Sequence, residues 1–319
     1  MAVLSTGSAV VLLSQDASAE TLSLRFSWKL KGEYAFFYLG QKNGLYKDAN
    51  IDLHLGEGAG AQAALAAVVQ GQEDLAVVPG IFALTAIQKG MPVKIVALYQ
   101  PAAPVVFISH QENPVLKPAD LEDKSIASSV GETSTAYLNE FCTRNRIDCG
   151  KIKKINMDSQ VRISEFMQRR VDVVGVYRTS DLPLLKEKTG GNLAVLDLPE
   201  FGLTVPGLAV VARGDSVEKN AVVLRRFFAA TDKAIEMTRK DPDAATAALK
   251  TVWRAGPSDS IVREQVEATS RSIPASAGKP TGWVDESTIS NAVHLVKAAE
   301  DVGGPKPLSS FYTNELLAR

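Results

Sequence analysis

Short apolar runs alternate with helical segments along most of the chain. Runs rich in β-branched and other apolar residues, typical of strands, lie at residues 22–28, 51–55, 75–78, 93–98, 105–109, 125–128, 171–177, 193–198 and 208–212. Apolar positions at helical spacing lie between them, at residues 34–43, 83–89, 161–170 and 179–188, and a further helix is expected to follow residue 131 and run through residue 141. This alternation predicts α/β layers with mainly parallel sheets.

Beyond residue 215 the pattern becomes helical. Helices are expected at residues 217–238, 242–253, 260–272 and 285–302, and no further strand is evident. A helical tail after two α/β blocks suggests that the chain returns to the first block and packs helices on it. We therefore expect residues 20–105 and 208–319 to form one lobe and residues 106–207 to form a second lobe. Two crossings, near residues 104–108 and 205–209, would form a hinge.

Residues 1–19 differ from everything after them. An apolar run from Ala9 to Leu13 precedes Ala17-Ser18-Ala19, which is an A-x-A signature of signal-peptide cleavage. The positive n-region is missing, so the start has been assigned too late or the run is a chance apolar tail. Export would place the mature start near Glu20, in the periplasm. No lipobox-type cysteine follows, which favours a soluble protein over a lipid-anchored one.

The composition excludes several classes of partner. The 319 residues are enough for two lobes with separate cores. A net charge of −1 lacks the basic excess that nucleic acid or an anionic membrane would favour. No apolar stretch reaches the roughly 20 residues needed to span a bilayer, so direct membrane insertion is not expected. The three histidines, His54, His110 and His294, are too widely spaced for a zinc site. We expect a monomer without metal or cofactor.

Cys142 and Cys149 lie seven positions apart around an expected helix end. In an oxidising compartment a local disulfide between them is plausible. Two reduced cysteines, one packed on a helix, are the alternative, because the sequence does not show whether their Cβ vectors face each other.

Candidate ligand contacts follow from where the strands end. In open parallel sheets, ligands bind beyond the carboxyl ends of the strands, where loops run into helix N-termini. In the first lobe, this rule selects residues in three loops and one aromatic residue after a later strand: Trp28, Lys29, Tyr34, Gly58, Val78, Pro79, Gly80 and Tyr99. The alternative for the first loop is that Trp28 packs in the core and Lys29 is solvated. The glycine-rich segment 56–60 lacks the spacing of a dinucleotide fingerprint or a P-loop, which disfavours nucleotide hydrolysis.

The second lobe offers polar groups, an aromatic ring and a cation. The candidates there are Ser129, Glu132, Thr133, Ser134, Tyr177, Arg178 and Thr204. The segment 128–134 places hydroxyls and backbone N–H groups at a helix start, where they would hold an anion or act as a plain N-cap. Arg178 is a candidate anion clamp, because its planar guanidinium matches a carboxylate.

A family resemblance rests on residues 32–53, GEYAFFYLGQKNGLYKDANIDL, and on three later matches. These are residues 64–71 with EDLAVV at 73–78, QKGMPVKIVA at 88–97, and LEDKSI at 121–126. Over about residues 22–215 the chain resembles periplasmic substrate-binding proteins of the hydroxymethylpyrimidine, taurine, nitrate and aliphatic-sulfonate type.

The resemblance implies a type II periplasmic-binding fold, two lobes that close on a ligand, and delivery of that ligand to an ABC transporter permease. The aromatic candidates favour an aromatic or heteroaromatic ligand with an anionic group. A carboxylated aromatic, a thiamine-precursor pyrimidine and a sulfonate stay open as alternatives.

Two other classes compete with a binding protein. Enzymes of similar fold act on pyrimidines or sulfinates, but they need a reactive cysteine or histidine in the cleft, and the expected cleft loops contain neither. We therefore expect no catalysis. A regulator's ligand-sensing domain would carry a DNA-binding helix pair before residue 22, and the apolar leader favours export instead.

Overall fold

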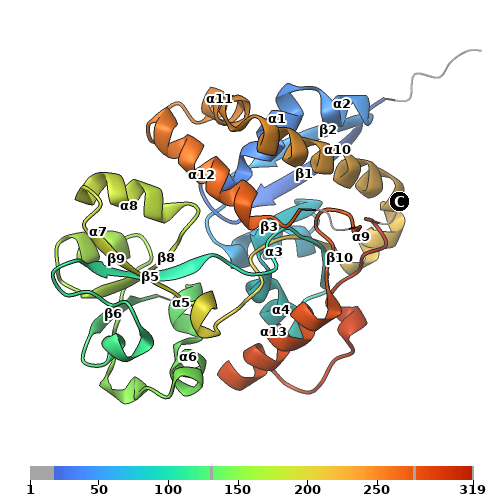
Figure 1. The fold of residues 1–319 in the computed structure, drawn as a ribbon. Coiled ribbons are helices and arrows are strands. Elements are labelled where there is room, and N and C mark those ends of the chain that lie inside the picture. The colour runs from blue at the N-terminus through green and yellow to red at the C-terminus, as the bar shows by residue number, and fades with distance from the viewer. Residues whose placement is uncertain (1–17, 130–131, 276–277, 318–319) are drawn as a thin grey trace, which may run out of the picture.

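The computed structural model describes residues 18–129, 132–275 and 278–317. The predicted leader therefore lies, from residue 1 to 17, outside the described residues. Two five-stranded sheets form the centres of two lobes (Figure 1). The first sheet has the order β2 (Ile51–Gly56), β1 (Glu20–Phe26), β3 (Leu75–Pro79), β10 (Leu208–Arg213) and β4 (Val93–Leu98). The second has the order β7 (Lys153–Asn156), β6 (Ser125–Ser128), β8 (Val173–Tyr177), β5 (Val105–His110) and β9 (Leu193–Asp197).

Each sheet contains one strand that runs against its neighbours. β10 is antiparallel to β3 and β4, and β5 is antiparallel to β8 and β9, whereas β1 pairs in parallel with β2 and β3, and β6 with β7 and β8. Both antiparallel strands come directly after the chain has passed from one sheet to the other, between β4 and β5 and between β9 and β10. The α/β prediction with mainly parallel sheets is confirmed.

Helices cover both sheets. Those next to the first sheet are η1 (Gly32–Tyr34), α1 (Ala35–Lys42), α2 (Leu45–Asp48), α3 (Ala61–Val69) and α4 (Gly80–Gln88). Those of the second are η2 (Pro118–Leu121), α5 (Thr133–Ala136), α6 (Leu138–Asn145), η3 (Cys149–Lys151), α7 (Arg162–Met167), α8 (Asp181–Thr189) and η4 (Pro199–Phe201). The tail forms α9 (Gly214–Lys219), α10 (Ala221–Lys240), α11 (Pro242–Val252), α12 (Asp259–Ser272), α13 (Glu286–Ala299) and η5 (Leu308–Ser310).

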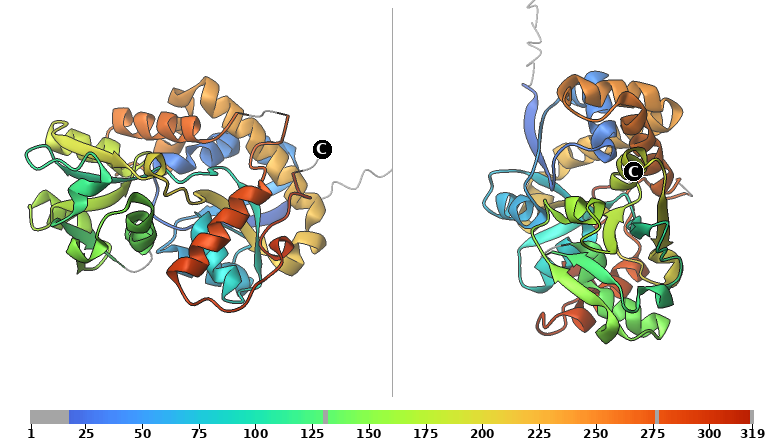
Figure 2. Two further views of the ribbon diagram at one scale, coloured as in Figure 1. Left: turned by 60° about the horizontal axis from the view of Figure 1, so that its bottom comes forward. Right: turned by 90° about the vertical axis from the view of Figure 1, so that its left-hand side faces the viewer.

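The helical tail packs on helices of the first sheet and also reaches the second lobe. α10 and α11 lie against α1, and α13 lies against α4. The ring of Phe37 on α1 stacks on that of Phe227 on α10 at a centroid distance of 6.3 Å. α12 also contacts α8, and α13 contacts α6, so the tail bridges the two lobes, as the two views of Figure 2 also show. Within the described part of the chain, no helix is long and apolar enough to cross a membrane.

Two elements differ from the sequence prediction. The helix expected to run through residue 141 is split into α5 and α6 at Tyr137, whose φ of −112° and ψ of 21° are not helical. Strand β7 was missed, because all four of its residues are exposed and carry no alternation of apolar and polar side chains. An edge strand of this kind leaves little signal in the sequence.

Cys142 and Cys149 are joined in a disulfide, with 5.7 Å between their Cα atoms. The bond ties the buried face of α6 to η3. Of the two alternatives that the sequence left open, the structure has the bridged pair.

Candidate functional site

A cavity of about 940 Å³ lies between the lobes. Residues at or just after the carboxyl ends of β1, β2, β3, β6 and β8 line it, so strands of both sheets contribute. The lining also includes α3, α4 and the start of α7. The carboxyl ends of strands from both sheets thus face the same cavity, which is where open α/β sheets bind ligands.

Seven of the predicted contacts line this cavity. Trp28, Tyr34 and Pro79 come from the first lobe, and Ser129, Glu132, Thr133 and Tyr177 from the second. Aromatic side chains therefore reach the same space from both sides. Eight predicted residues lie outside the lining: Lys29, Gly58, Val78, Gly80, Tyr99, Ser134, Arg178 and Thr204.

Lys29 and Arg178 are engaged elsewhere by carboxylates. The Lys29 ammonium lies 3.3 Å from Glu57 and its side chain is 72% exposed. The Arg178 guanidinium pairs with Asp197 at the end of β9, with 44% of its side chain exposed. Arg178 is therefore not placed as the anion clamp that the sequence suggested.

The other predicted residues outside the lining are in the core, in close backbone packing or at the surface. Val78 and Tyr99 are buried in the first lobe, where Tyr99 meets the ring of Phe36 edge-on at 5.6 Å. Thr204 is exposed. A Cβ on residue 58 would lie 2.0 Å from the carbonyl oxygen of Phe26, so the glycine is needed for packing against the end of β1. Gly80 donates its N–H to the carbonyl of Gly207.

The aromatic walls are held by specific contacts. Tyr34 stacks on Phe26 with ring centroids 4.0 Å apart. The Tyr177 hydroxyl lies 3.0 Å from Thr133 Oγ1, and the Lys31 ammonium lies 5.8 Å from the centre of the Tyr177 ring. Tyr177, which is partly exposed, presents a fixed apolar face to the cavity, whereas Tyr34 is 1% exposed and supports the wall from behind.

The helix start in the second lobe is occupied by the protein's own carboxylate. Glu132 caps α5: its Oε1 accepts from the Ser134 N–H at 2.7 Å and its Oε2 from the Thr135 N–H at 3.0 Å. The hydroxyls of Ser134 and Thr135 also donate to Glu132. These backbone and hydroxyl donors, which the sequence analysis considered for an anionic ligand, are used by the N-cap.

A buried carboxylate from the first lobe lines the cavity. Glu33 in η1 is 9% exposed. Burial raises the pKa of its carboxyl, and the Lys31 charge and the Tyr34 hydroxyl oppose that rise in part. A carboxylate with so little water needs a polar or cationic partner.

Lys31 spans the two lobes. Its ammonium lies 3.2 Å from Ser180 Oγ and 3.4 Å from Asp181 Oδ1, both in the second lobe. Burial lowers the pKa of Lys31, but the carboxylates of Asp181 and Glu33 outweigh burial and the net pKa is raised. Lys31 is therefore charged and engaged within the protein.

Gln265 of α12 joins the lobes through its side-chain amide. Its Oε1 accepts from the Gly32 N–H at 2.9 Å, and its Nε2 donates to the Ser180 carbonyl at 2.6 Å. The side chain is buried, so both bonds are shielded from water. The two bonds hold the first lobe to Ser180 of the second lobe.

Arg162 is a cleft residue that the sequence analysis missed. It lines the cavity at the start of α7, and its Nη1 donates to the Gly175 carbonyl at 3.0 Å. Its Nε is buried without a hydrogen-bond partner among the described residues, as is Ser129 Oγ. The sequence pattern did not reveal β7. The strand-end rule therefore did not select Arg162, which follows that strand.

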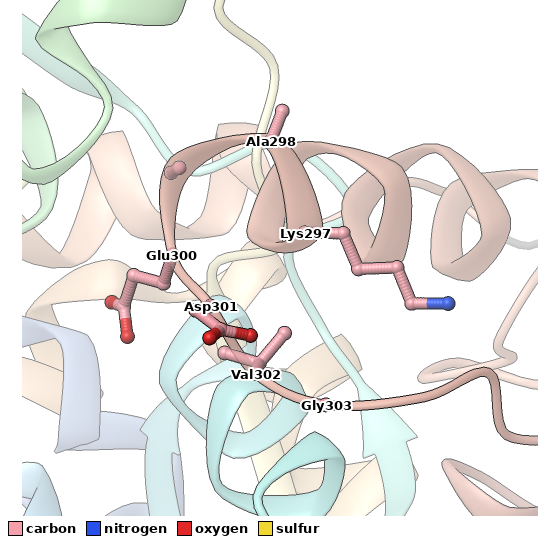
Figure 3. A pocket seen from close by; sticks show the side chains of 7 residues that line it. Lys297, Ala298, Glu300, Asp301, Val302 and Gly303 are labelled. Atoms are coloured by element: carbon pink, nitrogen blue, oxygen red, sulfur yellow. The ribbon is translucent and has the colours of Figure 1, made fainter.

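A smaller hollow of about 430 Å³ lies at the end of α13 and is lined by residues 297–303 (Figure 3). Lys297 points away from Glu300 and Asp301 there, so the hollow does not gather its charges around one point. A single segment of chain forms it, and Glu300 pairs with Lys89 at 2.6 Å.

The described histidine and cysteine side chains lie outside the lining of the cavity. His110 stacks on Phe166 and contacts its carbonyl at 3.0 Å, and His54 pairs with Asp52 at the surface. Cys142 and Cys149 form a disulfide, so neither is a free thiol. Within residues 18–129, 132–275 and 278–317, no cluster of three or more histidine, cysteine or carboxylate side chains could hold a metal ion.

Several solved structures share this fold over most of the chain. The ligand-binding component of an ABC-type import system from Staphylococcus aureus has a TM-score of 0.70 at 16% identity, covering 93% of this chain and 98% of that one. The periplasmic aliphatic sulphonate-binding protein SsuA from Escherichia coli has a TM-score of 0.69 at 19% identity, covering 88% and 86%. The periplasmic nitrate-binding protein NrtA from Synechocystis PCC 6803 has a TM-score of 0.66 at 14% identity, covering 93% and 87%.

These similarities confirm the predicted two-lobed fold of periplasmic binding proteins. No curated protein matches the sequence. The family described as NMT1/THI5 like matches residues 31–245, which include every strand of the two sheets except β1. The chain belongs to the NMT1/THI5-like family.

Proposed function

We propose that the protein is the solute-binding component of an ABC import system and captures a small aromatic or heteroaromatic molecule with an acidic group. One observation carries the proposal: Trp28 and Tyr34 of one lobe and Tyr177 of the other line the same cavity. A flat ring between the partly exposed Trp28 and Tyr177 would contact both lobes at once, and the buried Tyr34 would support the first wall from behind. The acidic group is placed at Arg162, in place of the Arg178 clamp expected from the sequence.

A ligand that binds between the two lobes couples its own binding to closure of the lobes. A ligand that contacts both lobes stabilises the arrangement in which they are close, and a transporter can recognise that arrangement. The proposal includes a permease partner, a periplasmic location, a monomeric state and the lobe bounds 20–105 with 208–319 and 106–207. Structural relatives described as periplasmic binding proteins and as a component of an import system support it.

We propose binding without catalysis. The described residues that line the cavity include no histidine and no cysteine, and those are the groups that the alternative, an enzyme acting on a pyrimidine or a sulfinate, would require. Incubating the purified protein with candidate pyrimidines and sulfinates tests this directly. Turnover of any of them would replace the binding-only proposal.

The ligand class is tested by native mass spectrometry of the purified protein, followed by thermal shifts with aromatic acids, pyrimidines and sulfonates. We expect at least one aromatic compound to raise the melting temperature, and Trp28→Ala to abolish that rise. Lys29→Ala is the matched control, because the neighbouring side chain is exposed and outside the cavity. If no compound of the three classes shifts the melting temperature, the proposed ligand class is wrong.

A further inference from the structure

We infer that the ligand is dipolar, with a cationic or N–H donor group held by Glu33 and an acidic group held by Arg162 and Ser129. The inference rests on the proposed function and adds the polarity and orientation of the molecule in the cleft. Glu33 belongs to the first lobe, and Arg162 and Ser129 to the second. Each lobe would thus recognise one end of the ligand.

The acidic end is assigned from two donors that the fold leaves unused. Arg162 Nε and Ser129 Oγ are both buried without a hydrogen-bond partner among the described residues, and both residues line the cavity. Arg162 makes its one described side-chain bond to the Gly175 carbonyl, and no described carboxylate pairs with it. Unsatisfied buried donors are costly, and a carboxylate or other oxyanion would satisfy both of them.

The two lysines that line the cleft already have partners within the protein and are less suited to hold an acidic group of the ligand. Lys31 is bonded to Ser180 and Asp181, and Lys89 is paired with Glu300. The α5 start is closed by Glu132. Arg162 is therefore the cleft cation whose charge the described carboxylates leave uncompensated.

The N–H donor group of the ligand is assigned to Glu33 because this carboxylate is buried at the cavity wall. The carboxylate is 9% exposed and lines the cavity, and its two oxygens offer acceptor positions to a ligand there. Lys31 attracts Glu33 electrostatically but directs its hydrogen bonds to Ser180 and Asp181. A ligand that covered Glu33 without an N–H group would remove the last water from a charged group and bind poorly.

The test uses a matched series of benzene derivatives in isothermal titration calorimetry on the full protein. The probes are 3- and 4-(aminomethyl)benzoate, which carry both groups, 4-methylbenzoate, 4-methylbenzylamine and the neutral 4-methylbenzyl alcohol. We expect one aminomethylbenzoate isomer to bind at least tenfold more tightly than either singly charged probe. Equal affinity for all probes that bind would overturn the inference.

Two variants assign the ends. Glu33→Gln is expected to weaken the amine-bearing probes at least fivefold and to leave 4-methylbenzoate unchanged, and Arg162→Gln to do the reverse. Arg170→Gln, an exposed arginine of the second lobe that pairs with Glu165, is the control that changes neither. Circular dichroism checks folding. If Arg162→Gln does not fold, Arg162→Lys, which keeps the charge and removes Nε, should still weaken the acid-bearing probes. An unchanged affinity in that variant would remove Arg162 from the assignment.

The outcomes separate this inference from the proposed function. If the neutral probe binds as well as the dipolar ones and Trp28→Ala abolishes binding, an aromatic capture protein stands and the dipolar assignment fails. If no probe binds and no aromatic compound shifts the melting temperature, the proposed function fails with it.

Discussion

Gly175 on β8 lies directly beneath Ser134: a Cβ on residue 175 would be 1.6 Å from Ser134 Oγ and 3.0 Å from Glu132 Oε1. The strand and the capped start of α5 therefore pack with no room for a side chain between them. The Gly175 carbonyl also receives the Arg162 guanidinium. One glycine thus supports both the capped helix start and the cleft arginine.

We predict that Gly175→Ala destabilises the protein by about 3 kcal/mol, because overpacking at a site with no free space forces the helix start away from the strand. Urea unfolding measures the difference. Gly304→Ala is the control, since no atom within 4 Å would meet a Cβ there and its φ is not in the left-handed range. An equal stability of both variants would show that the helix start moves without cost.

The buried Glu33 carboxylate predicts a pH-dependent cost in stability. Burial raises its folded-state pKa above the ordinary value, although Lys31 and Tyr34 oppose this and Asp181 adds to it. Below the unfolded-state pKa, Glu33 is protonated in both states and costs no stability. As the pH rises through the folded-state pKa, the buried carboxyl ionises and the free energy of unfolding falls.

Glu33→Gln removes this cost. We expect the variant to melt at a higher temperature than the parent protein at pH 7, with the difference vanishing below about pH 4. Differential scanning fluorimetry across this range measures it. The exposed Glu187→Gln is the control, expected to show no such trend. A difference that grows towards acid would contradict the prediction.

The Gln265 amide predicts a change in lobe spacing. Removing it in Gln265→Ala breaks the buried bonds to Gly32 and Ser180, each worth about 1 kcal/mol, and favours separated lobes. Small-angle scattering of the ligand-free variant should give a larger radius of gyration than the parent protein. Gln168→Ala, which loses an exposed bond from the C-cap of α7 to Ser164, should leave the radius unchanged.

The disulfide predicts a redox-dependent stability. Cross-linking residues seven positions apart restricts a short loop of the unfolded chain, which contributes about 2–3 kcal/mol. We expect dithiothreitol to lower the melting temperature of the parent protein. The double variant Cys142→Ala with Cys149→Ala should melt at that lower temperature with or without the reductant. A reductant effect on the double variant would place its origin elsewhere.

The fold was predictable because its strands carry strong local signals. Val93–Leu98 and Ser125–Ser128 begin and end where their apolar patterns do. The strand-end rule also found the aromatic cleft residues, because parallel strands place their following loops at one edge. β7 could not be found in this way, since its side chains are all exposed.

The charged part of the cleft was less predictable, because it depends on partners far away in the sequence. Arg178 and Lys29 follow strands as the rule requires, but Asp197 and Glu57 draw them away from the cavity. Glu132 was placed correctly at the cavity, yet its side chain serves the helix start that was considered for a ligand. Such pairings are set by three-dimensional proximity that a linear pattern does not contain.

The position of β10 determines when the first sheet can be completed during synthesis of the chain. This strand lies between β3 and β4 but is separated from them in sequence by the whole second sheet. Residues 105–197 supply every strand of that second sheet, so it can assemble on the ribosome from one continuous stretch. The first sheet has a gap between β3 and β4 until residues 208–213 emerge. The amino-terminal half should therefore complete its folding after the middle of the chain, against the usual order of synthesis.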